Sequence, residues 1–180
     1  MHSDVIFAGF GGQGVLLAGK ILAQAGVIEN KHVTFFPSYG GEMRGGTANC
    51  TVVVSDKRID SPVTSEPGAA IIFNNPSMGR FEPAICQGGL LLVNSSMVNT
   101  TSDRSDLQAD YIPANEIAHE LGDERVVNMI LLGSYTEKSG VVSLDSLKQA
   151  LNKLMANKRS TVIEINHRAI DAGAAATKEQ

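Results

Sequence analysis

Residues 5–14 read Val5-Ile6-Phe7-Ala8-Gly9-Phe10-Gly11-Gly12-Gln13-Gly14, and this stretch decides the fold. Its four leading apolar residues, bounded by Asp4 and a glycine cluster, are typical of a short strand buried on both faces. From Val15 onward the apolar residues recur at helical spacing, which predicts a helix that ends near Glu29 and Asn30. The stretch therefore joins a buried strand to a helix through a glycine turn, the start of an α/β fold.

The rest of the chain continues this alternation of short apolar strands and helices. Further strands are expected at residues 33–36, 47–55, 70–73, 90–93 and 111–113, and helices at residues 76–85, 114–121, 126–135, 143–155 and 163–178. This order predicts a three-layer, Rossmann-like α/β fold with a mainly parallel sheet flanked by helices. The segment 47–55 follows another strand directly, so we expect an antiparallel or edge element there. No repeat or linker divides residues 1–180, which predicts a single domain.

Composition narrows the classes of function. The chain has 180 residues and a net charge of −4, and it lacks the basic patch of a nucleic-acid-binding protein. No apolar run reaches the roughly 20 residues that cross a bilayer, so we expect a soluble, cytoplasmic protein. Cys50 and Cys86 lack metal-binding spacing, and two thiolates cannot hold an iron–sulfur cluster. We therefore expect reduced thiols and no metal site.

The first glycine loop suits an anion. Gly9, Gly11 and Gly14 match the pattern G-x-G-x-x-G, and the following helix offers unpaired N–H groups and a positive dipole end. A true NAD site also needs an acid after the second strand, and residues 34–38 contain none. The loop is no P-loop either, because Val15 and Leu16 follow it. Contact with an anion or cofactor, a tight turn without ligand, and an NAD site all remain open.

The second glycine loop spans residues 38–46 and is more unusual. Two Gly-Gly pairs flank Glu42, Met43 and Arg44, whose charges can pair with each other, with a partner, or with a phosphate or carboxylate. The loop follows the second strand, so both glycine loops are expected at the same edge of the sheet. A flexible surface loop with a solvated ion pair is the alternative.

Two asparagine positions near this edge are expected to be structural. Asn128, at the start of its helix, could cap that helix or face the carboxyl edge, and the cap is favoured; Asn74 with Asn75 is expected to form a turn. Ser143 is expected to cap the helix at 143–155.

The two loops together resemble a known family. The stretches Gly9-Phe10-Gly11-Gly12-Gln13-Gly14-Val15 and Pro37-Ser38-Tyr39-Gly40-Gly41-Glu42-Met43-Arg44-Gly45-Gly46-Thr47-Ala48-Asn49-Cys50 are similar to the gamma subunit of 2-oxoacid:ferredoxin oxidoreductases. The second stretch looks closest to the 2-oxoglutarate and 2-oxoisovalerate enzymes. Gly41 departs from the Pro that many relatives carry, which loosens the loop but leaves Glu42 and Arg44 in register. The resemblance covers most of the chain.

The resemblance implies a subunit that is inactive alone. The complex would convert a 2-oxoacid and coenzyme A to an acyl-CoA, CO₂ and reduced ferredoxin, with 2-oxoglutarate favoured. Thiamine diphosphate with Mg would lie between alpha- and beta-type subunits, and iron–sulfur clusters in beta- or delta-type subunits. The gamma-type subunit would complete the active site or the coenzyme A site, with no catalytic residue of its own.

The residues that we expect to bind a cofactor or dock on a partner come from both loops: Gly9, Gly11, Gly12, Gln13, Gly14, Ser38, Tyr39, Glu42, Arg44, Gly45 and Gly46. None of the four histidines belongs to a triad pattern. The alternatives are a stand-alone nucleotide-dependent enzyme and a stand-alone coenzyme-A- or phosphate-binding module that acts as a regulator or homodimer. The sequence leaves open which 2-oxoacid is used and whether coenzyme A touches this chain.

Overall fold

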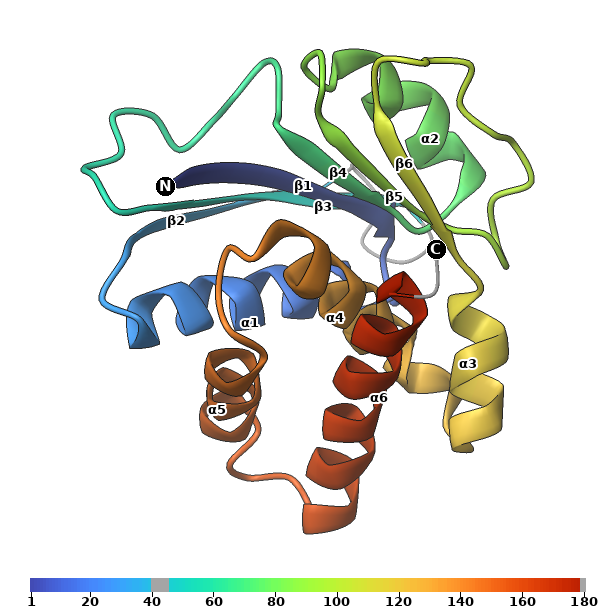
Figure 1. Cartoon of the computed structure of the whole chain (residues 1–180). Helices are drawn as coiled ribbons and strands as arrows, with labels where there is room; N and C mark the ends of the chain where they lie inside the picture. The colour runs from blue at the N-terminus through green and yellow to red at the C-terminus, as the bar shows by residue number, and fades with distance from the viewer. Residues whose placement is uncertain (40–45, 179–180) are drawn as a thin grey trace.

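A six-stranded sheet runs through the middle of the computed structural model, which describes residues 1–39 and 46–178 (Figure 1). Its strands are β1 (His2–Phe10), β2 (His32–Tyr39), β3 (Thr47–Ser55), β4 (Ala69–Ile72), β5 (Leu90–Asn94) and β6 (Gln108–Ile112). They lie in the order β2-β3-β1-β4-β5-β6. β3 is antiparallel to both of its neighbours, and the pairs β1–β4, β4–β5 and β5–β6 are parallel. The mainly parallel sheet is therefore confirmed.

Helices cover both faces of the sheet and make the three layers that we predicted (Figure 1). They are α1 (Val15–Ile28), α2 (Asn75–Phe81), α3 (Ala114–Leu121), α4 (Val127–Ser139), α5 (Leu144–Leu154) and α6 (Ser160–Lys178), with short 3-10 turns η1 (Glu82–Ala84) and η2 (Glu124–Val126). α2 lies on one face, and the other five helices lie on the opposite face. No helix in the described part of the chain is both long and apolar enough to cross a membrane.

The sheet has a carboxyl edge, where β1, β2, β4, β5 and β6 all end, and an opposite amino edge. β2 runs in the same direction as β1, because β3 between them is antiparallel to both. The chain leaves β1 toward β3 and β2 on one side, and later adds β4, β5 and β6 on the other side. In such sheets, ligands bind at the carboxyl ends of the strands where the order reverses. Here that point lies between β1 and β4.

Two details of the sheet differ from our expectations. β3 is not an edge strand but lies between β1 and β2, so β2 forms the edge. We also expected the second strand to end at Pro37, whereas β2 continues to Tyr39. An edge strand tolerates proline because its missing N–H can face the open side, where no neighbouring strand needs a donor.

α4 and α6 touch along their backbones at two glycines. A Cβ atom on Gly133 would lie 2.1 Å from the carbonyl oxygen of Ile170, and one on Gly173 would lie 1.9 Å from that of Ile130. The Ser134 hydroxyl donates a hydrogen bond of 2.8 Å to the carbonyl oxygen of Gly173. Residues 128–136 of α4 are all buried, which makes α4 the central helix of its layer.

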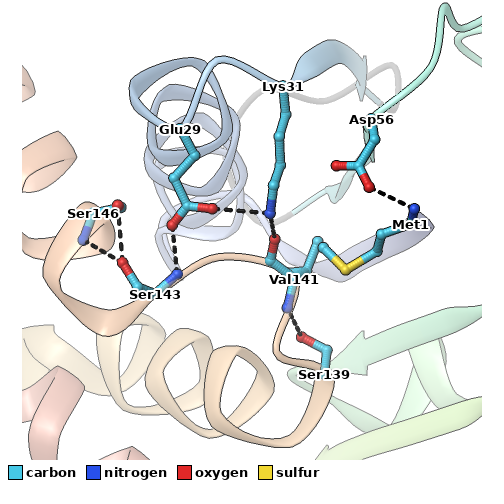
Figure 2. Close-up of polar contacts among 8 residues, drawn as sticks. All are labelled: Met1, Glu29, Lys31, Asp56, Ser139, Val141, Ser143 and Ser146. Atoms are coloured by element: carbon cyan, nitrogen blue, oxygen red, sulfur yellow. Dashed lines mark hydrogen bonds and ion pairs between the residues drawn. The ribbon is translucent and has the colours of Figure 1, made fainter.

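The C-terminal end of α1 is fastened to the start of α5 at the amino edge (Figure 2). Glu29 accepts a 2.7 Å hydrogen bond from the backbone N–H of Ser143, and its other carboxylate oxygen lies 2.9 Å from Lys31 Nζ. Lys31 also donates to the carbonyl oxygen of Val141. Burial alone would raise the pKa of Glu29, but the hydrogen bonds from Ser143 and Lys31 outweigh it and lower this pKa to about 2. Ser143 caps α5, as we predicted, by accepting from the N–H of Ser146.

Candidate functional site

The first glycine loop is a tight turn from β1 into α1, and its glycines are required for two reasons, backbone conformation and space. Gly12 and Gly14 have φ values of 100° and 75°, a region that favours glycine. Gly9 is needed for space, because a Cβ there would lie 2.6 Å from Gln13 Oε1 and 2.8 Å from Phe73 Cβ. Among the described residues, nothing lies within 4 Å of the place where a Cβ of Gly12 would stand. The surface of the loop is therefore open at Gly12.

Gln13 closes the loop from inside. Its Oε1 accepts a 2.7 Å hydrogen bond from the N–H of Phe10 and a 3.1 Å hydrogen bond from Asn74 Nδ2. Asn74 also caps α2, because its Oδ1 accepts from the N–H of Ser77 at 3.0 Å. The structural role that we expected for Asn74 is thus confirmed. The oxygen of Gln13 is already used within the protein.

Asn128 holds the same loop from the helical layer. Its Nδ2 donates a 3.1 Å hydrogen bond to the carbonyl oxygen of Gly14, and the side chain is buried. Our prediction that Asn128 caps its helix was wrong, because α4 already begins at Val127, directly after the turn η2. The cap of η2 is Asp123, whose carboxylate accepts from the N–H of Arg125. Asn128 thus supports the glycine loop instead of ending a helix.

The N-terminal end of α1 is suited to an anion. Gly14 is its N-cap, no side chain caps the helix, and its first turn has no acidic residue. No side chain of the first turn therefore competes with a bound anion for the unpaired N–H groups and the positive end of the helix dipole. A phosphate or carboxylate oxygen is the kind of group that such an end binds.

The second glycine loop begins and ends beside the first. The N–H of Gly11 donates a 2.9 Å hydrogen bond to the carbonyl oxygen of Gly46. Ser38, at the carboxyl end of β2, pairs with Asn49 of β3, and the backbone of Tyr39 pairs with that of Ala48. The described ends of both loops thus lie at the carboxyl edge. The positions Glu42, Arg44 and Gly45 lie outside the described residues.

The carboxyl edge holds further amides that our sequence reasoning did not select. Asn94 ends β5 and is buried, and its Nδ2 donates a 2.9 Å hydrogen bond to Asn115 Oδ1. Its own Oδ1 has no hydrogen-bond partner among the described residues. The signal that could have found Asn94 is its position directly after the apolar run 90–93, just as Asn74 directly follows the apolar run 70–73. That Gln13 and the glycines bind a cofactor or a partner stays a prediction.

Cys50 lies under the start of α1, where its Sγ is 3.8 Å from the carbonyl oxygen of Val15. Burial raises the pKa of Cys50 to about 12, which keeps its thiol neutral and unreactive. Both cysteines are free, and Cys86 is half-buried. His167 Nε2 lies 2.8 Å from Asn152 Oδ1, and His119 faces Glu124 at the surface. Within residues 1–39 and 46–178, no group of three or more His, Cys, Asp or Glu side chains could hold a metal ion.

Comparison with known proteins gives a consistent set of relatives. The family model described as pyruvate ferredoxin/flavodoxin oxidoreductase matches residues 4–176. The 2-oxoglutarate synthase subunit KorC of Methanocaldococcus jannaschii is 34% identical over 154 residues, which cover 84% of this chain and 82% of KorC. The ketoisovalerate oxidoreductase subunit VorA of Methanothermobacter marburgensis is 39% identical over 172 residues, which are 94% of this chain but only 35% of VorA. The chain thus spans about a third of the length of VorA.

A solved structure shares the whole fold. The keto/oxoacid ferredoxin oxidoreductase gamma subunit from Geobacter sulfurreducens superposes with a TM-score of 0.84 at 27% identity. The match covers 99% of each chain. The six-stranded sheet with its single reversed strand therefore has a counterpart of the same extent.

Proposed function

This chain belongs to the pyruvate ferredoxin/flavodoxin oxidoreductase family, and we propose that it is the gamma-type subunit of a multi-subunit 2-oxoacid:ferredoxin oxidoreductase. The observation that carries the proposal is the match to KorC, which extends over most of both chains. We infer that residues 1–180 act as one gamma-type domain. We also infer a cytoplasmic location, which the free thiols of Cys50 and Cys86 support.

We propose that separate chains supply the rest of the enzyme. The counterpart of this chain makes up only 35% of VorA, so it is joined there to a remainder about twice as long. Here alpha- and beta-type subunits, and a delta-type subunit in some arrangements, would take that place. They would hold thiamine diphosphate with Mg and the iron–sulfur clusters, and would pass electrons to ferredoxin. The complex would oxidise a 2-oxoacid to an acyl-CoA and CO₂, and the named relatives favour 2-oxoglutarate or 2-oxoisovalerate.

The role that we propose for this chain is to complete the active site or the coenzyme A site with its carboxyl edge. Coenzyme A supplies the thiol that accepts the acyl group. Its phosphate groups fit the edge, because Gly12 is open and α1 begins without a capping side chain or an acid. Gly12 and the first N–H groups of α1 are the groups that would hold such a phosphate.

A stand-alone nucleotide-dependent enzyme is the alternative. A ribose would need an acid at the carboxyl end of β2, and the described residues there are Ser38 and Tyr39. Glu29 lies at the opposite end of α1 and is bonded to Ser143 and Lys31. This geometry favours the subunit over the alternative.

Capture of the chain from its native cell, followed by mass spectrometry of what comes with it, tests the proposal. We expect a thiamine-diphosphate-dependent subunit and turnover of a 2-oxoacid in the captured complex, with none in the isolated chain. Capture without any such subunit, or saturable NAD(P) binding by the chain alone, would overturn the proposal.

A matched pair of glycine variants tests the role of the edge. Gly12 and Gly88 have φ values of 100° and 78°, and both have open space around a new Cβ. An alanine at either position costs about 1 kcal/mol of backbone strain. We expect Gly12→Ala to lower the turnover of the assembled complex about tenfold or more. Gly88→Ala should leave turnover unchanged, and equal turnover in the two variants would exclude the first loop from the site. Arg44→Ala, in the second loop, should likewise lower turnover in a folded chain.

A further inference from the structure

The outer side of β2 is an open sheet edge. β2 is eight residues long and carries no Lys, Arg, Asp or Glu, and in the described part of the chain only β3 pairs with it. Proteins usually protect such an edge with charged side chains, bulges or a covering segment, because its free N–H and C=O groups attract other strands. Pro37 is the one protective residue that β2 carries.

Apolar side chains gather on both sides of β2. Six large apolar side chains are strongly exposed among the described residues, and three of them, Val27, Phe36 and Leu154, lie around β2 with exposures of 53%, 46% and 44%. Val27 and Leu154 line a groove of about 350 Å³ together with Val33 and Phe35. Phe36 points to the other face of the sheet, because side chains alternate along a strand.

The groove carries one unpaired charge at its rim. Lys20 is the only charged residue of α1, it lines the groove, and it is exposed. Among the described residues it has neither an ion-pair partner nor a side-chain hydrogen bond. A carboxylate on a bound segment would complement this ammonium group.

We propose that β2 is the docking edge for the catalytic partner subunit, which adds an extended apolar segment to the sheet beside β2. Alternate side chains of that segment would fill the groove and cover Phe36, and an acidic residue of the segment would face Lys20. The occupant is argued from VorA, in which the counterpart of this chain is only 35% of one polypeptide, so that a longer segment is joined to it and is available to pack against it. The inference rests on the proposed function and deepens it, since it names the surface through which the subunits join.

A matched pair of variants tests the docking edge in the captured complex. Val27 and Val63 are the same residue type, with exposures of 53% and 52%, but Val63 lies on the loop between β3 and β4, away from the groove. We expect Val27→Gln to weaken binding of the purified partner subunit about tenfold, whereas Val63→Gln should leave it unchanged. Lys20→Glu should slow association, most strongly at low salt. Hydrogen exchange of the β2 amides should slow when the partner binds.

The other possible results would contradict either the proposed function, the docking edge or its occupant. If the unchanged chain binds no thiamine-diphosphate-dependent subunit, the proposed function fails, and the docking edge fails with it. If the unchanged chain binds but Val27→Gln behaves like Val63→Gln and the β2 amides exchange as before, only the docking edge fails. If light scattering finds the isolated chain dimeric and Val27→Gln monomeric, the groove is covered by a second copy, and the proposed occupant is wrong.

Discussion

The two ends of α1 are held in different ways. At its C-terminal end, the charged groups of Glu29 and Lys31 fasten the helix to the start of α5. At its N-terminal end, the neutral amides of Gln13, Asn74 and Asn128 support a glycine turn. The difference shows that the N-terminal end of α1 is the end that can bind an anionic ligand. A carboxylate beside the first turn of α1 would compete with an anionic ligand, and neutral amides do not.

The largest effect on the free energy of unfolding should come from a substitution at the N-terminal end of α1, which the neutral amides support. We expect Gly14→Ala to lower the free energy of unfolding by about 3 kcal/mol. Gly14 has a φ of 75°, and its new Cβ would lie 2.3 Å from Asn128 Nδ2, so the variant suffers backbone strain and also loses the hydrogen bond from Asn128. Denaturant unfolding measures the change.

Gly88→Ala is the control for that variant. Gly88 has nearly the same backbone conformation, with a φ of 78°, but no described residue lies within 4 Å of its new Cβ. It should lose only about 1 kcal/mol, from strain alone. Equal losses in the two variants would mean that Asn128 does not support the loop.

A substitution at the C-terminal end of α1, which Glu29 and Lys31 hold, should give the next largest effect on the free energy of unfolding. This effect should depend on pH. Glu29 has a folded pKa of about 2, below its ordinary value of 4.5, so its ionised form stabilises the fold. This contribution is complete above pH 4.5 and is lost as the pH falls toward 2. We expect Glu29→Gln to lower the free energy of unfolding by about 2 kcal/mol at pH 7.

The difference between the wild-type chain and Glu29→Gln should shrink on acidification. Unfolding measured in steps from pH 7 to pH 2.5 checks this, because other carboxylates affect both proteins alike. The exposed Glu120→Gln should differ from the wild type by less than about 0.5 kcal/mol at every pH. A Glu29→Gln difference that stays constant with pH would contradict the charged fastening.

The smallest effect should come from the two helix caps, one at each edge. Asn74→Ala at the carboxyl edge removes the cap of α2 and also the bond to Gln13, whereas Ser143→Ala at the amino edge removes the cap of α5. We expect losses of about 1.5 and about 1 kcal/mol in the free energy of unfolding, measured in denaturant. If Ser143→Ala costs more, the bond between Asn74 and Gln13 contributes nothing.

The sequence predicted whether a segment is a strand or a helix better than it predicted which strands lie next to one another in the sheet. Apolar runs and helical spacing depend on nearby residues, so the strand and helix at residues 5–28 and the cap at Ser143 were predicted correctly. The position of β3 inside the sheet depends on pairing with β1, about 45 residues away, which no local pattern reports. Pro37 was taken as the end of a strand because only the tertiary structure shows that β2 is an edge.

The candidate site was predicted in part. Glycines at a strand end are a local signal, so the first loop and its place at the carboxyl edge could be found from the sequence. For Asn128 the favoured role was the wrong one of two, and Asn94 was not selected, because both side chains make their contacts with residues distant in the chain. The same holds for Gly133 and Gly173, whose importance lies only in the helix that packs on them.

The contact between α4 and α6 has a consequence for the order of events in the cell. A ribosome makes residues 160–178 after every other element of this chain, yet α4 is buried on all sides partly by them. Until α6 emerges, the backbone groove at Gly133 and the apolar residues beside it remain exposed to water and to chaperones. The helical layer can therefore close only after residues 160–178 have left the ribosome.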